Sequence, residues 1–196
     1  HARPIRASSF GAAGKPLELW LSYLSLLPPI DPYLAAAASL GRSALGGAGA
    51  VMVHHTRVRS FAAVPEEAAA TARAARDIGI RIGFAVALRD RNPLVYGPTE
   101  PVLGALPPEA RAEIAARISV PAPDVAAQIR LVDEVDAALG EDVRAQYGPT
   151  GPQWCSDELL VAVAEASALT GRRVHMHLLE TRYQREWADR QRKPGG

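Results

Sequence analysis

The chain has 196 residues, of which 48% are hydrophobic, and a formal net charge of +1 at pH 7. This length can bury a substantial core, and the near-neutral charge gives no reason to expect nucleic acid or an acidic membrane surface as a partner. No apolar run reaches the roughly 18 residues of a membrane span, the N-terminus lacks a signal-peptide pattern, and the single cysteine, Cys155, excludes an internal disulfide, so we expect a cytoplasmic protein.

The first third of the chain predicts two helices and a strand. Residues 17–24 have the apolar spacing of a helix. Asp31 is a good N-cap with a proline directly after it, which predicts a second helix over residues 32–45. The short apolar run 50–55 follows glycines and is predicted to be a buried strand.

The middle of the chain continues this alternation. Residues 64–77 begin with a proline and two acids and predict a helix, and the apolar run 81–88 predicts the next strand. A charged loop, residues 89–93, follows that strand directly. Two more helical patterns occupy residues 107–117 and 122–139.

The last third predicts two strands, each followed by a helix. Residues 143–148 are a weaker strand candidate because they are mostly polar. After a glycine- and proline-rich loop, Ser156 is placed to cap a helix that ends near Gly171. Residues 174–180 predict the last strand, and residues 182–191 a final helix.

The alternation of strands and helices predicts an α/β fold with a parallel sheet and helices outside it. Polar side chains lie at or directly after the end of every predicted strand, and in parallel α/β proteins the carboxyl ends of the strands build the active site. These side chains are His54, Arg89, Gln153 and His177. Only about four strands are predicted, whereas a closed (β/α) barrel takes eight strands and about 250 residues.

The last predicted strand carries the clearest chemical pattern. Alternation along a strand places His175 and His177 on one face. Glu180 follows three residues after His177, and the two converge only if the backbone turns at Leu178 or Leu179. A neutral imidazole and a carboxylate are what metal-assisted hydrolysis needs. The alternative is a buried strand whose histidines bond to neighbours while Glu180 caps the next helix.

Two segments together resemble a known family. Residues 147–160, Tyr-Gly-Pro-Thr-Gly-Pro-Gln-Trp-Cys-Ser-Asp-Glu-Leu-Leu, and residues 174–181, Val-His-Met-His-Leu-Leu-Glu-Thr, are similar to the amidohydrolase superfamily. The resemblance is to the branch of cytosine and guanine deaminases and triazine hydrolases. It implies a metal-dependent (β/α) TIM-type barrel beside a small β-sandwich, which hydrolyses carbon–nitrogen or aryl-halide bonds of nitrogen heterocycles.

The resemblance also implies roles for individual residues. His177 matches the metal-ligating histidine at the end of the fifth barrel strand, and Glu180 matches the glutamate that shuttles protons. His1 matches the second histidine of the His-x-His motif after the first strand. One divalent metal ion, zinc or iron, is implied. Residues 1–196 would then form a partial barrel, from the end of strand one to the helix after strand five. The rest of the barrel and the β-sandwich would lie outside this chain.

Three further residues are candidates for contact with the substrate. Gln153 offers an amide that can read the donors and acceptors of a heterocycle. Trp154 either stacks on a flat ring or covers the core, and His54 either reaches the substrate or is a hydrogen-bonded core histidine.

The sequence thus predicts a metal-dependent hydrolase that deaminates a small heterocyclic molecule with a cyclic amidine. One alternative is a triazine-type hydrolase that removes halide or alkylamine. An alternative of another class is a non-catalytic α/β binding module with structural histidines. Whether copies of the chain form a homo-oligomer is left open.

Overall fold

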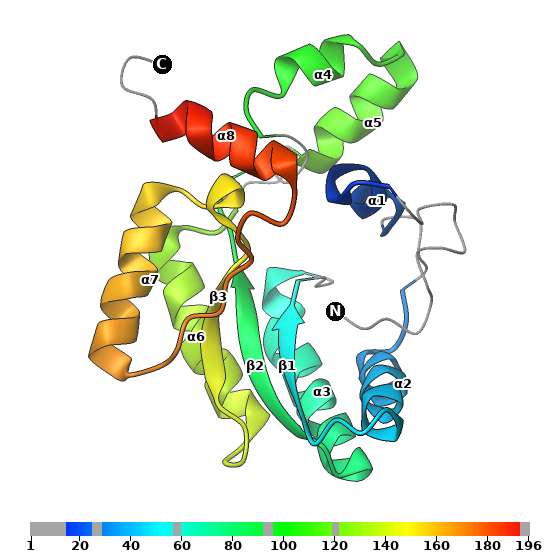
Figure 1. Cartoon of the computed structure of the whole chain (residues 1–196), viewed down its shortest axis with the longest axis vertical. Helices are drawn as coiled ribbons and strands as arrows, with labels where there is room; N and C mark the ends of the chain where they lie inside the picture. The colour runs from blue at the N-terminus through cyan, green and yellow to red at the C-terminus, as the bar shows by residue number, and fades with distance from the viewer. Residues whose placement is uncertain (1–14, 25–28, 57–59, 92–95, 119–121, 193–196) are drawn as a thin grey trace.

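The centre of the molecule is a three-stranded parallel sheet in the order β1-β2-β3 (Figure 1). The computed structural model describes residues 15–24, 29–56, 60–91, 96–118 and 122–192. The strands are β1 (Ala50–His55), β2 (Arg81–Leu88) and β3 (Ala145–Pro149). Both strand pairs are parallel, so the prediction of an α/β fold with a parallel sheet is confirmed.

The helices lie close to their predicted positions: α1 (Leu17–Leu24), α2 (Pro32–Leu45), α3 (Val64–Ile78), α5 (Pro108–Ile118), α6 (Val125–Leu139), α7 (Asp157–Thr170) and α8 (Arg182–Arg192). The short helix α4 (Glu100–Gly104) and the 3₁₀ turns η2 (Phe61–Ala63) and η3 (Pro152–Trp154) were not predicted. Helix α6 begins later than the predicted residue 122, because the side chain of Asp124 caps it by accepting a hydrogen bond from the backbone nitrogen of Ala127 at 2.7 Å.

The predicted helix ends are explained by local side-chain and backbone contacts. Asp31 accepts a hydrogen bond from the backbone nitrogen of Leu34 at 3.0 Å, and Ser156 accepts one from Leu159 at the same distance. Helix α7 ends at Gly171, whose φ of 71° lies in the left-handed region that glycine enters without steric cost. These contacts set where the helices stop and the strand-end loops begin.

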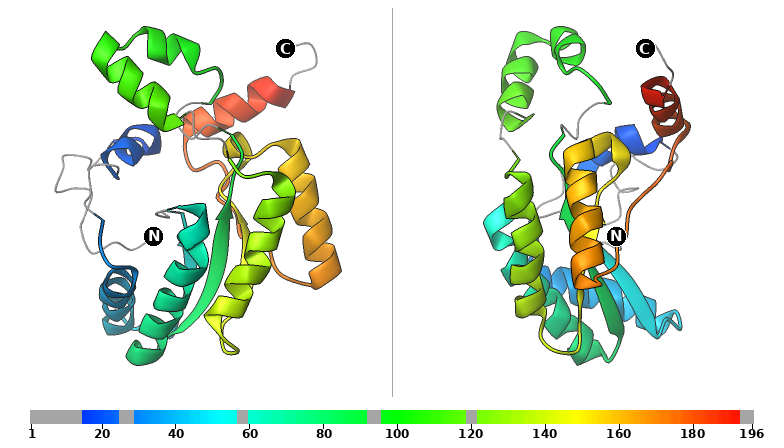
Figure 2. Two further views of the ribbon diagram at one scale, coloured as in Figure 1. Left: turned by 180° about the vertical axis from the view of Figure 1, so that it is seen from behind. Right: turned by 90° about the vertical axis from the view of Figure 1, so that its left-hand side faces the viewer.

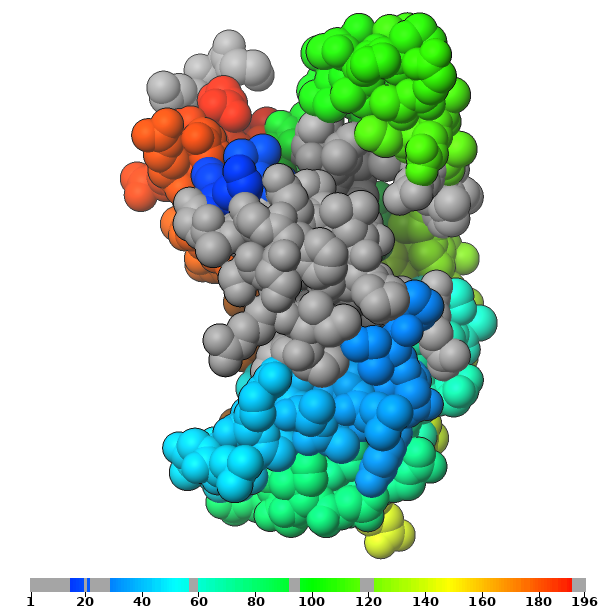
Figure 3. All heavy atoms as spheres, turned by 90° about the vertical axis from the view of Figure 1, so that its right-hand side faces the viewer, coloured from blue at the N-terminus to red at the C-terminus, as the bar shows by residue number. Residues whose placement is uncertain are grey.

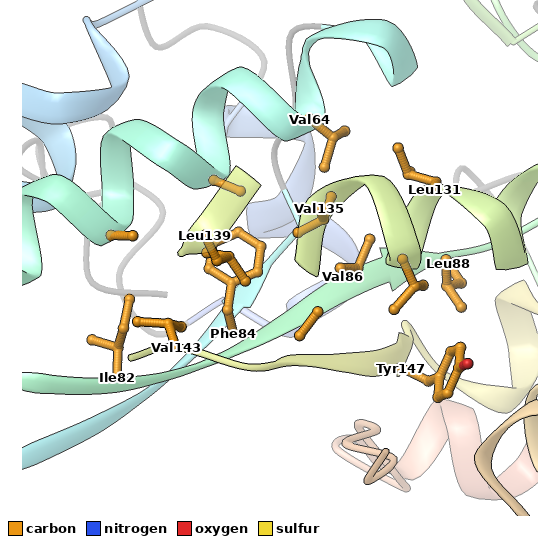
Figure 4. Packing of buried hydrophobic residues seen from close by; sticks show 14 of the residues in the cluster. Val64, Ile82, Phe84, Val86, Leu88, Leu131, Val135, Leu139, Val143 and Tyr147 are labelled. Carbon is orange, nitrogen blue, oxygen red and sulfur yellow. The ribbon is translucent and has the colours of Figure 1, made fainter. Parts of the chain in front are cut away.

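The core lies between the sheet and the helices α3, α6 and α7, which lie side by side on one face of it (Figure 2). Alternate residues of β2 point into this layer and pack against α3 and α6 (Figure 4); they are Ile82, Phe84, Val86 and Leu88. On the other face of the sheet, His54 of β1 stands in register with Ala85 of β2 and Gln146 of β3. That face carries smaller and more polar side chains.

A second group of helices gathers at the end of the sheet where the strands finish. Figure 1 shows α1, α4, α5 and α8 at this end. In the side view of Figure 3, α4 and α5 lie at one end of the molecule, and α2 and α3 lie at the opposite end. Because these helices come from separate parts of the chain, the carboxyl ends of the strands are surrounded by residues that are distant in sequence.

Within the described ranges, no helix has the combination of length and apolar character needed to cross a membrane.

The predicted final strand is largely wrong. After α7 the chain returns beside β3 (Figure 1), but only Val174 forms a bridge, with Tyr147. Tyr147 donates a backbone hydrogen bond to Arg173 at 3.0 Å and accepts one from His175 at 2.8 Å. The next bond of a parallel ladder would need an N–H group from Pro149, and proline has none. The segment is therefore extended but is joined to the sheet at one point.

Candidate active site at the carboxyl ends of the strands

Three histidines from two distant segments meet at the carboxyl end of the sheet. His54 comes from β1, and His175 and His177 come from the segment after α7. The rings of His54 and His177 are stacked, with centroids 4.3 Å apart and planes inclined by 23°. The ring of His175 lies edge-on to His54 at 5.5 Å. The structure thus places His175 and His177 on the same side of the chain and next to a third imidazole.

The ring of His177 is oriented by a backbone carbonyl group. Its Nδ1–H donates a hydrogen bond to the carbonyl oxygen of Thr150 at 3.2 Å, in the loop after β3. In this tautomer the lone pair is on Nε2. Metal-ligating histidines generally donate their other ring N–H to a carbonyl or carboxylate in this way. This role of Thr150 could not be predicted from the sequence, because any residue can supply a backbone carbonyl.

His54 is a buried, neutral imidazole. Its Nε2–H donates a hydrogen bond to the carbonyl oxygen of Gly148 at 3.1 Å. Burial, with the neighbouring His177, lowers the pKa of His54 to about 4, so the ring is uncharged at neutral pH. His55 points to the other face of the sheet, where its Nε2 lies 2.8 Å from the carboxylate of Glu67. Of the two adjacent histidines, only His54 belongs to the site.

Gly148 leaves room for His54, and a side chain there is expected to destabilise the fold. A Cβ atom on residue 148 would lie 2.6 Å from the carbonyl oxygen of Val86 and 3.1 Å from His54 Nε2. We expect Gly148→Ala to cost about 1–3 kcal/mol, the usual range for overpacking, measured by chemical denaturation. Gly104→Ala is the control, because a Cβ atom at residue 104 meets no atom within 4 Å. Equal unfolding midpoints for the two variants would contradict this.

Glu180 is reached through a sharp turn of the backbone. Leu179 has a φ of 51°, the left-handed conformation that residues other than glycine rarely adopt. Leu179 is one of the two positions, with Leu178, at which a turn was expected from the sequence. Glu180 itself is exposed, and its backbone N–H donates a hydrogen bond to the side-chain oxygen of Gln184 at 2.8 Å. The backbone of Glu180 is thus held at a defined place directly after the histidine segment.

The loop after β3 carries two buried donors. Gln153 and Trp154 form part of η3 and are only 4% and 9% exposed. Gln153 Nε2 and Trp154 Nε1 have no hydrogen-bond partner among the described residues. A buried donor without a partner carries a large desolvation cost, which an acceptor on a bound ligand would remove. The ring of Tyr96, from the segment before α4, lies 6.0 Å from that of Trp154.

Two other residues in these loops have structural roles. Asp90, in the charged loop after β2, accepts a hydrogen bond from the backbone nitrogen of Ser156 at 2.7 Å and another from its hydroxyl group. It therefore ties the end of β2 to the start of α7. Cys155 is fully buried, and burial raises the pKa of its thiol, the opposite of what an activated nucleophile needs.

Among the described residues, His177 fits the role of a metal ligand. His177 has the tautomer of a ligand, with Nδ1 bonded to a carbonyl group. In the ranges that the structure describes, no group of three or more histidine, cysteine or acidic side chains is placed to hold a metal ion. His1, the second ligand expected from the sequence, lies outside the described residues. Catalytic zinc takes at least three protein ligands.

His54, His175 and His177 gather at the carboxyl ends of the parallel strands, which is where α/β enzymes build their active sites. The amidohydrolase family model matches residues 5–193, so the chain belongs to the amidohydrolase family. It is 47% identical over 45 residues to 5'-deoxyadenosine deaminase of Methanosarcina mazei, a match that covers 23% of this chain and 10% of the relative.

Solved structures of similar fold include those of a triazine hydrolase variant and of an atrazine chlorohydrolase. A triazine hydrolase variant aligns with a TM-score of 0.63 and 21% identity, over 89% of this chain and 37% of that chain. Atrazine chlorohydrolase TrzN from Arthrobacter aurescens TC1, complexed with zinc, aligns with a TM-score of 0.52 and 24% identity, over 74% of this chain and 29% of that chain. The chain thus spans about a third of the length of these structures.

Proposed function

We propose that this chain is part of the catalytic domain of a metal-dependent hydrolase that deaminates a nitrogen heterocycle. The observation that carries the proposal is the arrangement around His177. Its Nδ1–H is hydrogen-bonded to the carbonyl oxygen of Thr150, and its ring is stacked on the neutral His54. Glu180 follows it in the chain, after the turn at Leu179. The amidohydrolase match and the deaminase relative support a hydrolase of carbon–nitrogen bonds.

The proposed architecture is a (β/α) barrel. In it, β1, β2 and β3 would be three consecutive strands, the extended segment after α7 would take the next position along the barrel wall, and α3, α6 and α7 would lie on the outside. The likeness to the triazine hydrolases, which share the fold at low sequence identity, supports this. The remaining barrel units and a flanking β-sandwich would lie outside the chain.

The proposed metal ligands in this chain are His177 and His1. The ion, zinc or iron, would supply a Lewis acid that lowers the pKa of a coordinated water to about 7. The complex of TrzN with zinc supports zinc as the first ion to try. The contact of His177 with Thr150 would hold its ring in the ligating orientation.

The proposed chemistry of the protein's own residues centres on Glu180. Its carboxylate would take a proton from the attacking water and pass it to the departing amine. The water oxygen bonds to the ring carbon, the bond from that carbon to the exocyclic amine breaks, and ammonia leaves. The proton left on the added hydroxyl group moves to the adjacent ring nitrogen, which gives the ring carbonyl. The donors Gln153 Nε2 and Trp154 Nε1 would bind acceptors on the heterocycle, and His54 would pack beside His177 without carrying charge.

A second candidate is hydrolytic loss of halide or alkylamine from a triazine-type ring. It uses the same residues and differs only in the leaving group, and the structural likeness to triazine hydrolases favours it. A non-catalytic binding module is the third reading, in which the histidines only stabilise the strand ends.

The test uses the full-length protein that carries this chain, loaded with zinc or iron or depleted of metal. Aminated purines, pyrimidines and triazines, and chloro- and alkylaminotriazines, would be offered, and ammonia, alkylamine and chloride measured. We expect metal-dependent release of ammonia. Release of chloride or alkylamine alone would support the second candidate. Binding of these compounds without release of any product would refute a hydrolase.

A further inference from the structure

The turn before Glu180 is conformationally unfavourable and needs support from elsewhere. Leu179 adopts a φ of 51°, and its side chain is 45% exposed. In this conformation the Cβ atom of an L-residue crowds the backbone. Its own partly exposed side chain contributes little packing to hold it there. The support must therefore come from the residues that bind the backbone around the turn.

Gln184 provides that support. It is 1% exposed and belongs to the first turn of α8. Its side-chain oxygen accepts the backbone N–H of Glu180, directly after Leu179, at 2.8 Å. A buried amide bonded to the backbone in this way restrains both its own side chain and the peptide it holds.

The amide of Gln184 is itself fixed by partners that are distant in sequence. Its Nε2–H donates to the hydroxyl oxygen of Tyr96 at 3.3 Å, and this hydroxyl donates to Glu18 of α1 at 2.8 Å. The same oxygen of Glu18 accepts a hydrogen bond from the hydroxyl of Thr181. The bonds run in one direction from Gln184 to Glu18, so the amide of Gln184 has one favoured orientation.

We propose that Gln184 is a positioning residue for Glu180: its buried amide holds the left-handed turn at Leu179 and thereby aims the Glu180 carboxylate. The proposal rests on the proposed function for the role of Glu180. The simpler reading is a helix cap, because Thr181 and Gln184 have the spacing of a capping box. A cap would affect the stability of α8 without affecting the reaction.

The first experiment compares two buried glutamines in the full-length, zinc-loaded protein. Gln184→Met keeps the shape of the side chain but removes both hydrogen bonds. Gln128→Met is the matched control, because Gln128 is 2% exposed and bonds the backbone of Arg89 and Pro123. We expect Gln184→Met to lower kcat by about 10–10²-fold, as misplacement of a catalytic group does, with KM and zinc content unchanged. Equal losses of kcat in the two variants would overturn the proposal.

The second experiment asks whether Gln184 acts through the turn. Asparagine enters the left-handed region more readily than leucine does, so Leu179→Asn relieves the strain at an exposed position. In a double-mutant cycle, the loss of kcat caused by Gln184→Met is expected to be smaller in the Leu179→Asn background. Strictly additive losses would show that Gln184 and the turn act independently, which would overturn the proposal.

A third measurement does not depend on catalysis. Hydrogen exchange at the backbone amide of Glu180 should accelerate in Gln184→Met and remain slow in Gln128→Met. Unchanged exchange at Glu180 would overturn the proposal whatever the activity. Faster exchange in a protein that hydrolyses none of the compounds offered would instead refute the proposed function and leave Gln184 as the residue that holds the turn.

Discussion

Replacing Glu180 by glutamine in the full-length, zinc-loaded protein is expected to lower turnover by about 10²–10⁴-fold, the usual contribution of general acid–base catalysis. Glutamine keeps the shape and the hydrogen-bonding reach of the side chain but cannot accept a proton at neutral pH. The side chain of Glu180 is exposed and its backbone contact to Gln184 does not involve the carboxylate, so the fold should be retained. Metal content should also be unchanged.

Glu165→Gln is the matched control for this variant. Glu165 is exposed on α7, so the same change of charge there should leave the rate as it was. The measurements are turnover, zinc per chain by elemental analysis and the free energy of unfolding. A Glu180→Gln protein with a near-normal rate would show that the carboxylate does not move protons.

Replacing His177 by alanine is expected to remove metal and activity together. Loss of an outer partner of a metal ligand typically lowers affinity by about 10–100-fold, and loss of the ligand itself should cost more. The informative result is the difference between the two variants: Glu180→Gln should lose activity but keep metal, whereas His177→Ala should lose both, although the two residues are only three positions apart. A strand end with a purely structural role would give both substitutions similar losses of stability and no such division.

His175→Ala serves as the control for His177. It removes an imidazole from the same segment, on the same side of the chain, that also contacts His54. Elemental analysis should find zinc retained in His175→Ala and lost in His177→Ala. Full zinc content in the His177 variant, or equal loss in both, would contradict the assignment of His177 as a ligand.

The elements that could be predicted from the sequence are those whose signals are local. The cap at Asp31, the cap at Ser156 and the glycine after α7 each act within a few residues, and the structure has helix ends at all three. The strands β1 and β2 were predicted with their observed bounds, because each is a short apolar run between turn residues. The shared end of the strands then follows from parallel topology.

What could not be predicted depends on contacts between distant residues. The predicted last strand does not form because Pro149 of the neighbouring strand β3 has no N–H group to continue the hydrogen-bonded ladder. Nothing in residues 174–180 indicates which residue will face them. The partners of Gln184 come from α1 and from the segment before α4. A local signal for Gln184 existed, since a threonine followed three residues later by glutamine indicates a capping box, but it does not reveal what the glutamine holds.

The hydrogen bond between Glu18 and Thr181 joins residues 163 positions apart. The entropy lost in closing a loop grows with its length, and contacts of such large sequence separation form late in folding. The pairing of β1 with β2 through α3 needs a much shorter loop. Refolding should therefore assemble the sheet first and dock the start of α8 onto α1 afterwards. The surroundings of Glu180 would then be completed after the core, so that the refolding full-length protein should recover its native spectrum before it recovers the proposed activity.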